Sequence, residues 1–199
     1  MIKVLYDVLS EDEINKLLTE YNSADSYNTE AMKKVGPGPA VKIIDDLMYG
    51  YKRVGGNYYK HFNPYLPHTD HREEWGSSIN VVVPLHTDDP NASLVVFDQC
   101  YNKDSVTWCL HFDVQQYQVN TGVQGRPCDY EEVTNLSDQP VSDELYEKLK
   151  WTNKEQWFGL TGQALEFKPG NIMIFNNNHI HSTGIFEGTK TGLSLRYKL

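Results

Sequence analysis

PHTDHREEWGSSINVVVPL, residues 67–85, joins a polar His-X-Asp sequence to an apolar, β-branched run. A run of this kind, bounded by serine and proline, is typical of a buried strand. Side chains alternate along an extended chain, so His68 and Asp70 are expected to point to the same face. An imidazole and a carboxylate on one face are two of the three ligands of a 2-His-1-carboxylate metal site.

A third ligand is available in FKPGNIMIFNNNHIHSTGIFEGTKTGLSLRYKL, residues 167–199. This stretch contains His181 and, further on, the basic residues Lys190 and Arg196. An even number of positions separates the two basic residues, so on a strand both point to the same face. The order of His-X-Asp, distant histidine and later basic residue is the order in which a 2-His-1-carboxylate iron site is written.

Position along the chain favours the first of three His-X-Asp pairs as the pair of metal ligands. The three pairs are His68-Asp70, His86-Asp88 and His111-Asp113. The second pair falls in a turn, where aspartate is common for reasons unrelated to metals. The third pair comes late, with few strands left before the distal histidine. A related sequence, His61-Phe62-Asn63, has asparagine in place of the carboxylate and is expected to line the pocket.

Two histidines are candidates for the distal ligand. His179 and His181 alternate within NNNHIHSTG and are expected to share a face. Small residues follow His181 and leave room beside a metal, whereas His179 follows three asparagines, as a surface histidine often does. The sequence therefore favours His181.

Short strands separated by Gly- and Pro-containing turns dominate the chain. Strands are expected at residues 1–9, 79–85, 93–97, 106–114, 163–167, 171–175, 180–185 and 192–197. Ser10 and Glu13 have the spacing of a capping box at the start of a helix, and residues 142–151 predict another helix. Residues 41–54 are ambiguous between helix and strand. The pattern predicts a mainly β fold with flanking helices, a double-sheet antiparallel jelly roll.

The chain of 199 residues is expected to form one domain, 1–199, with an insertion at about 98–160. Long irregular insertions are often functional, so part of this one is expected to cover the pocket and select the substrate. The candidates for this role are Trp108, Arg126, Trp151 and Trp157. The tryptophans are equally typical of a core.

Composition narrows the class of partner. The formal net charge of −9 disfavours nucleic acid and anionic membrane surfaces, since phosphate contacts need an excess of basic residues. No apolar run is long enough for a signal peptide or a membrane span. The odd number of cysteines, without Cys-X-X-Cys spacing, indicates reduced thiols in the cytoplasm and gives no zinc signature. These cysteines are Cys100, Cys109 and Cys128.

In the stretches that contain His68, Asp70 and His181, the chain resembles the iron(II)- and 2-oxoglutarate-dependent oxygenases. Within that family it resembles the phytanoyl-CoA-hydroxylase-like branch more than the prolyl hydroxylases. Three stretches carry the resemblance: His68-Thr-Asp70 with SSINVVVPL, the segment FKPGNIMIFNNN, and His181 followed by KTGLSLRY at 190–197. Together they cover residues 51–97 and 161–199. The branch more often has arginine where this chain has Lys190.

The resemblance implies a double-stranded β-helix, the cupin-like jelly roll, with Fe(II) held by His68, Asp70 and His181. It also implies a basic residue that binds the distal carboxylate of 2-oxoglutarate. That residue is either Lys190, a point charge, or Arg196, whose planar guanidinium binds carboxylates bidentately. The candidate hydrogen-bond partners of the cosubstrate are Tyr58 and Tyr59.

The activity that the resemblance implies is hydroxylation of a small-molecule or peptidyl substrate by dioxygen, with release of succinate and carbon dioxide from 2-oxoglutarate. Two other hypotheses use the same barrel. One is a metal-binding cupin that acts as an isomerase or lyase without 2-oxoglutarate, and the other is a non-catalytic binding module. The sequence leaves the substrate and the oligomeric state open.

Overall fold

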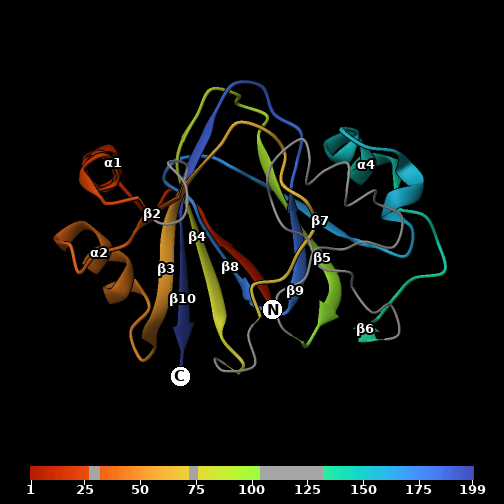
Figure 1. Cartoon of the computed structure of the whole chain (residues 1–199), viewed down its shortest axis with the longest axis horizontal. Coiled ribbons are helices and arrows are strands. Elements are labelled where there is room, and N and C mark those ends of the chain that lie inside the picture. Colours follow the sequence, from red (N-terminus) through yellow and green to blue (C-terminus); the bar gives the residue numbers. More distant parts are fainter. Residues whose placement is uncertain (27–31, 72–75, 104–131) are drawn as a thin grey trace.

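The computed structural model describes residues 1–26, 32–71, 76–103 and 132–199, and these form two antiparallel sheets (Figure 1). The first sheet runs in the order β1 (Ile2–Leu5), β8 (Ile172–Asn176), β4 (Ile79–Thr87), β10 (Lys190–Lys198), β3 (Lys52–His61) and β2 (Met32–Lys34). In the second sheet β5 (Ser93–Tyr101) pairs with β6 (Val133–Thr134), β7 (Gly162–Glu166) and β9 (His179–Thr183). The mainly β, antiparallel jelly roll expected from the sequence is confirmed.

Two helices cover the outer face of the first sheet (Figure 1). Helix α1 (Glu11–Ser23) begins with the expected capping box, in which Ser10 and Glu13 each bond the backbone N–H of the other. The segment 41–54, ambiguous from sequence, is helical in its first half, where it belongs to α2 (Pro39–Leu47). Its second half enters β3. The helices and the sheet share one core, which includes Leu17, Val41, Ile44, Val81, Leu193, Leu195 and Tyr197.

A second core fills the space between the two sheets. Its members come from both sheets and include Val82, Leu94, Val96, Leu165, Phe167, Met173 and Phe175. Because side chains alternate along a strand, neighbours on β3 lie in different cores, with Tyr58 on the helix side and Tyr59 between the sheets. The inner faces of β3, β4 and β10 therefore meet the inner face of β5 across a shared interior.

The region expected to be an insertion contributes a third core. Strand β5 continues to Tyr101, and helix α4 (Asp143–Leu149) with the short helix η3 (Lys154–Trp157) packs on the outer side of the second sheet (Figure 1). Trp157 is fully buried there and stacks on Phe97 with ring centroids 5.9 Å apart. Trp151 meets Trp157 edge to face at 5.5 Å.

Of the two roles that the sequence left open for Trp151 and Trp157, the structure shows the core, because neither lines the cavity between the sheets. Trp157 packs on Phe97 of β5, and Trp151 packs on Trp157 and donates from its indole N–H to the carbonyl of Thr183 at 3.3 Å. Trp108, Arg126 and the strand expected at 106–114 lie outside the described residues. None of the helices in the described ranges has the length and hydropathy that a membrane crossing requires.

Removal of the capping hydroxyl tests the role assigned to Ser10. The substitution Ser10→Ala should lower the free energy of unfolding by about 1 kcal/mol, because an N–H group of the first turn of α1 loses its acceptor. Urea unfolding followed by circular dichroism measures the change. Ser10→Asp should retain most of the stability, since aspartate also caps helices, and equal stability of the wild type and Ser10→Ala would contradict this role.

Candidate metal centre

A pair of backbone hydrogen bonds brings the two distant sequence stretches together. The N–H of His68 donates to the carbonyl of His181 at 2.9 Å, and the N–H of His181 donates to the carbonyl of His68 at 2.8 Å. This antiparallel bridge sets the two imidazoles side by side, with ring centroids 4.2 Å apart. The chain thus forms a single local site from residues before β4 and from β9.

The turn between β8 and β9 fixes the position of Asp70. Asn177 is buried in this turn, and its carbonyl accepts the N–H of Asp70 at 3.1 Å. The N–H of Asn177 donates to the carbonyl of Ser78 at 3.0 Å, so one residue holds both ends of the loop between Asp70 and β4. The carboxylate of Asp70 consequently lies beside His181, with 3.6 Å between Oδ2 and Nε2.

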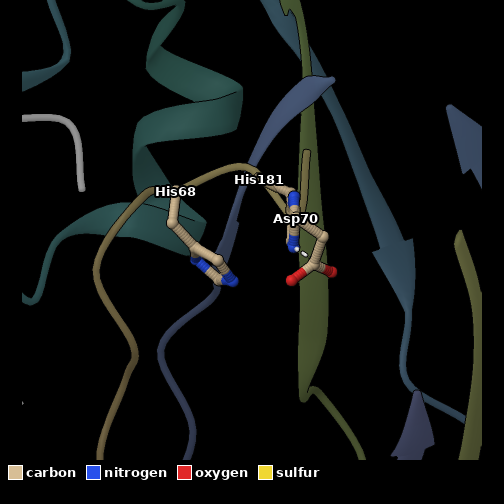
Figure 2. Close-up of side chains that lie close together, drawn as sticks. All are labelled: His68, Asp70 and His181. Carbon is tan, nitrogen blue, oxygen red and sulfur yellow. Dashed lines mark ion pairs between the residues drawn. The ribbon is translucent and has the colours of Figure 1, made fainter. Parts of the chain in front are cut away.

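Figure 2 shows the three side chains converging on one point from two segments of backbone. His68, Asp70 and His181 each offer one ligand atom, and these atoms all lie within 4.8 Å of one another. Two imidazoles and one carboxylate at this spacing form the donor set of a 2-His-1-carboxylate site, which suits Fe(II) and leaves coordination positions open. The structure therefore brings together the three residues that the sequence singled out.

Backbone carbonyls orient both imidazoles for metal binding. Nδ1 of His68 lies 2.8 Å from the carbonyl of Leu66, and Nδ1 of His181 lies 3.0 Å from the carbonyl of His179. A carbonyl only accepts, so each Nδ1 carries the proton and each Nε2 presents a lone pair. Metal-binding histidines are commonly oriented by such a bond from the nitrogen that does not bind the metal.

Burial keeps both imidazoles neutral. It lowers the pKa of His181 to about 3, and it also lowers the pKa of His68. For Asp70, burial is the largest single influence and raises the pKa, but the Arg196 guanidinium together with the neighbouring His181 and His68 lowers the pKa well below its usual range. Near neutral pH the site therefore offers two neutral nitrogens and an ionised carboxylate, the forms that bind a divalent cation.

Two side chains not assigned to the metal hold the Asp70 carboxylate. Arg196 Nη2 donates to Oδ1 at 2.8 Å, and Asn80 Nδ2 donates to Oδ2 at 2.8 Å. Sequence reasoning missed Asn80 altogether. The sequence signal for Asn80 was that it is a polar residue at the start of an otherwise apolar strand. It lies two positions before Val82 and therefore on the same face, which borders the space between the sheets.

The three candidate ligands open into a cavity of about 280 Å³ between the sheets. Its lining combines polar and aromatic side chains with a few aliphatic ones: Asn57, Tyr59, His61, Tyr65, Val82, Leu94, Ser182, Thr183, Lys190, Ser194 and Arg196, with Met32 at the edge strand. His61 lies on the strand expected to line the pocket. It is directly opposite Lys190 in the pairing of β3 with β10.

Lys190 places an amine deep inside this cavity. Its side chain is fully buried, its Nζ donates to the carbonyl of Ser93 at 2.7 Å, and the Nζ lies 4.1 Å from the centroid of the Phe167 ring. Burial lowers the pKa of Lys190 to about 7. A buried ammonium that donates to a neutral carbonyl is well suited to bind an anionic ligand.

The two adjacent tyrosines separate into different environments. Tyr59 lines the cavity, where burial raises the pKa of its hydroxyl and keeps it protonated. Tyr58 faces the helices instead and donates from its hydroxyl to Glu20 at 3.1 Å. The expectation that Tyr58 contacts the cosubstrate is therefore wrong, because the alternation of β3 turns its side chain away from the cavity.

The competing histidines lie elsewhere or have other partners. His86 is exposed and pairs with Asp88 at 3.1 Å, while Asp88 also accepts the N–H of Thr189 at 2.7 Å as part of a surface turn. His179 points Nδ1 at the carbonyl of Phe97, 2.7 Å away, and does not line the cavity. His111 and Asp113 lie outside the described residues.

Comparison with known proteins finds similar folds but no related sequence. Neither a protein-family profile nor a curated protein sequence matches the chain. Among solved structures, the Pseudomonas putida prolyl-4-hydroxylase is similar, with a TM-score of 0.54 and 11% identity over 99% of this chain and 91% of that one. At this identity, the likeness shows the fold.

Two further structures share the architecture. HygX from Streptomyces hygroscopicus, with nickel, 2-oxoglutarate and hygromycin B bound, has a TM-score of 0.53 and 11% identity over 98% of this chain and 82% of that chain. The alpha-ketoglutarate-dependent epimerase SnoN of nogalamycin biosynthesis has a TM-score of 0.52 and 11% identity, covering 99% of this chain and 77% of that one.

Metal binding tests the site directly. The substitution His68→Ala should weaken the binding of Co(II), a stable stand-in for Fe(II), at least about 100-fold, because one of three ligands is lost. His86→Ala is the matched control, since it removes an exposed histidine from the other described His-X-Asp pair. Titration of the visible Co(II) absorption measures both. Equal affinity of His68→Ala and His86→Ala would contradict the site.

Proposed function

We propose that this protein is a non-haem Fe(II)- and 2-oxoglutarate-dependent dioxygenase that hydroxylates its substrate, with release of succinate and carbon dioxide. The observation that carries the proposal is one cavity lined both by the His68, Asp70 and His181 ligands and by the buried amine of Lys190. The fold supports it, because HygX has been solved with 2-oxoglutarate bound and SnoN is alpha-ketoglutarate dependent.

In this proposal the ferrous ion is held by Nε2 of His68, Nε2 of His181 and the carboxylate of Asp70. When bound, the ion supplies the activation of dioxygen, which amino-acid side chains cannot perform. The protein holds the ligands neutral or ionised as required, and it shields the reacting atoms from water. The aliphatic side chains of Val82 and Leu94 contribute to this shielding inside the cavity.

We assign the distal carboxylate of 2-oxoglutarate to Lys190 and not to Arg196. The guanidinium of Arg196 is already bonded to Asp70 at 2.8 Å and to Asn57 Oδ1 at 3.3 Å, so it lies at the metal end of the cavity. Lys190 provides an ammonium as a point charge, and the protonated hydroxyl of Tyr59 adds a hydrogen-bond donor.

A glycine gives Tyr59 access to the cavity. A Cβ added at Gly192, two residues after Lys190 on the same strand face, would lie 2.5 Å from the Tyr59 hydroxyl oxygen and 3.1 Å from Cζ of Phe167. The distance to Tyr59 is shorter than a Cβ contact allows and the distance to Phe167 is tight, so a larger residue would displace the Tyr59 ring and press on Phe167. The absence of a side chain at Gly192 thus leaves room for Tyr59 in the cavity and for the Phe167 ring, whose centroid lies 4.1 Å from the amine of Lys190.

Lys190 also favours an oxygenase over the two other hypotheses. A metal-dependent isomerase or lyase that uses no 2-oxoglutarate needs the triad but no buried amine beside it. A non-catalytic binding module needs neither neutral imidazoles nor open metal positions. Hydroxylation is proposed as the outcome, and product analysis separates it from epimerisation or ring closure, since the structural neighbours include an epimerase and a carbocyclase.

We further propose a small-molecule or peptidyl substrate. The cavity of about 280 Å³ is small, and the net charge of −9 works against binding of nucleic acid. The cysteine pattern supports a reducing compartment such as the cytoplasm. Cys100 forms no disulfide within the described ranges.

Cosubstrate turnover tests the proposed reaction. Incubation with Fe(II), ascorbate and 2-oxoglutarate should release succinate, which chromatography with mass detection measures. The substitution Asp70→Ala should lower the rate at least about 100-fold, because the carboxylate ligand is lost. His86→Ala should turn over at the wild-type rate. Unchanged succinate release by Asp70→Ala would rule out the proposed reaction.

The pH dependence of cosubstrate binding tests Lys190. The ammonium form binds the carboxylate, and the pKa of Lys190 in the free protein is about 7, so above pH 7 binding requires uptake of a proton. The affinity for 2-oxoglutarate, measured calorimetrically at saturating Mn(II), should fall roughly tenfold per pH unit above 7.

The control for this titration is Lys190→Arg, because a guanidinium stays charged throughout the range. Its affinity for 2-oxoglutarate should be nearly constant from pH 7 to 9. The same pH slope in the wild type and in Lys190→Arg would show that another group controls binding.

A further inference from the structure

We infer that Asn80 and Arg196 are positioning residues, which hold the Asp70 carboxylate in its metal-binding orientation before the metal arrives. The inference rests on the proposed function, because Asp70 is the carboxylate ligand of that proposal. It starts from the two hydrogen bonds that Asp70 accepts, one at each oxygen. Each bond is 2.8 Å long, within the range of charge-assisted hydrogen bonds.

The two oxygens of Asp70 are distinguished by their neighbours. Oδ2 lies 3.6 Å from Nε2 of His181, so it is the oxygen nearer to that ligand nitrogen. It accepts from Asn80 with one lone pair and retains another for a metal. Oδ1 accepts from Arg196. The carboxylate is therefore prevented from rotating about its Cβ–Cγ bond by a donor on each side.

Asn80 occupies its position at an energetic cost that packing alone does not explain. The side chain is fully buried, and its carbonyl oxygen Oδ1 has no hydrogen-bond partner among the described residues. An unsatisfied buried polar atom costs about 1–3 kcal/mol, and an apolar residue of similar size would avoid that cost. A flipped amide would place Oδ1 against the Asp70 carboxylate, so the observed orientation is the one that donates to Asp70.

Strand pairing explains how both donors reach the same carboxylate. Asn80 on β4 and Arg196 on β10 are directly opposite in the antiparallel register, and their side chains therefore share the inner face of the sheet. Arg196 also donates to Asn57 on β3 at 3.3 Å, which ties its guanidinium to a third strand. The sheet thus places the two donors, and the loop held by Asn177 places the acceptor.

Two substitutions with matched controls test the inference through metal binding. Asn80→Leu removes the donor to Oδ2 of Asp70. Asn171→Leu removes another fully buried asparagine, which lies away from the site and whose Oδ1 accepts the N–H of Asp7 at 3.1 Å. Arg196→Lys keeps the charge but loses the planar fork, and Arg53→Lys makes the same change in the Arg53–Asp45 pair.

We expect Asn80→Leu and Arg196→Lys to bind Co(II) about 10–100-fold more weakly than the wild type, with an altered visible Co(II) spectrum. Asn171→Leu and Arg53→Lys should keep the wild-type affinity and spectrum, whatever stability they lose in urea. This comparison separates positioning from folding, because a purely structural residue would change the urea midpoint and leave the Co(II) spectrum unchanged.

The possible outcomes separate failure of the positioning role from failure of the proposed metal centre. If the wild type binds Co(II) and both site variants match it in affinity and spectrum, the positioning role is wrong and the proposed metal centre stands. If the wild type itself binds no Co(II), Fe(II) or Mn(II), the metal centre fails and the positioning role fails with it. If only one of the two variants weakens binding, the role is overturned for the other residue alone.

Discussion

The two hydrogen bonds between the backbones of His68 and His181 are the constraint on which the site depends. Together they contribute roughly 1–3 kcal/mol, too little to hold two remote segments by themselves. The pairing of β9 with β5 and the contacts of Tyr65 support them, since the carbonyl of Tyr65 accepts from Ser182 Oγ at 2.8 Å and from the N–H of Thr183 at 3.3 Å. The surrounding jelly roll therefore stabilises this pair of hydrogen bonds.

The alternation of side chains along the strands of the first sheet separates stability from chemistry. On β10, Leu193 and Leu195 face the helices and build the outer core, while Lys190 and Arg196 face the cavity. On β3, the same division separates Tyr58 from the cavity-lining residues. A shift of one residue in the pairing of these strands would exchange the two sets, so the outer core also fixes the register that the site needs.

Much of this arrangement could be predicted from sequence, because it follows from local patterns. The capping box at Ser10, the β-branched run before Leu85 and the order of His68, Asp70 and His181 are visible in short windows of residues. What could not be predicted depends on partners distant in sequence. Nothing near Arg196 shows that its guanidinium pairs with Asp70, and alternation alone does not say which of two adjacent tyrosines faces inward. The same holds for Trp157, which is buried against Phe97 of β5, and for Trp151, which packs on Trp157.

The carbonyls of Leu66 and His179, which accept hydrogen bonds from the Nδ1–H groups of His68 and His181, belong to the main chain. A carboxylate or amide side chain in the same role would be lost by a single codon change at its position. A peptide carbonyl survives every substitution of its own residue, and only a change that moves the backbone can remove it. Evolutionary drift at these two positions is therefore compatible with constant imidazole tautomers, and selection on them acts through the shape of the chain rather than the identity of its residues.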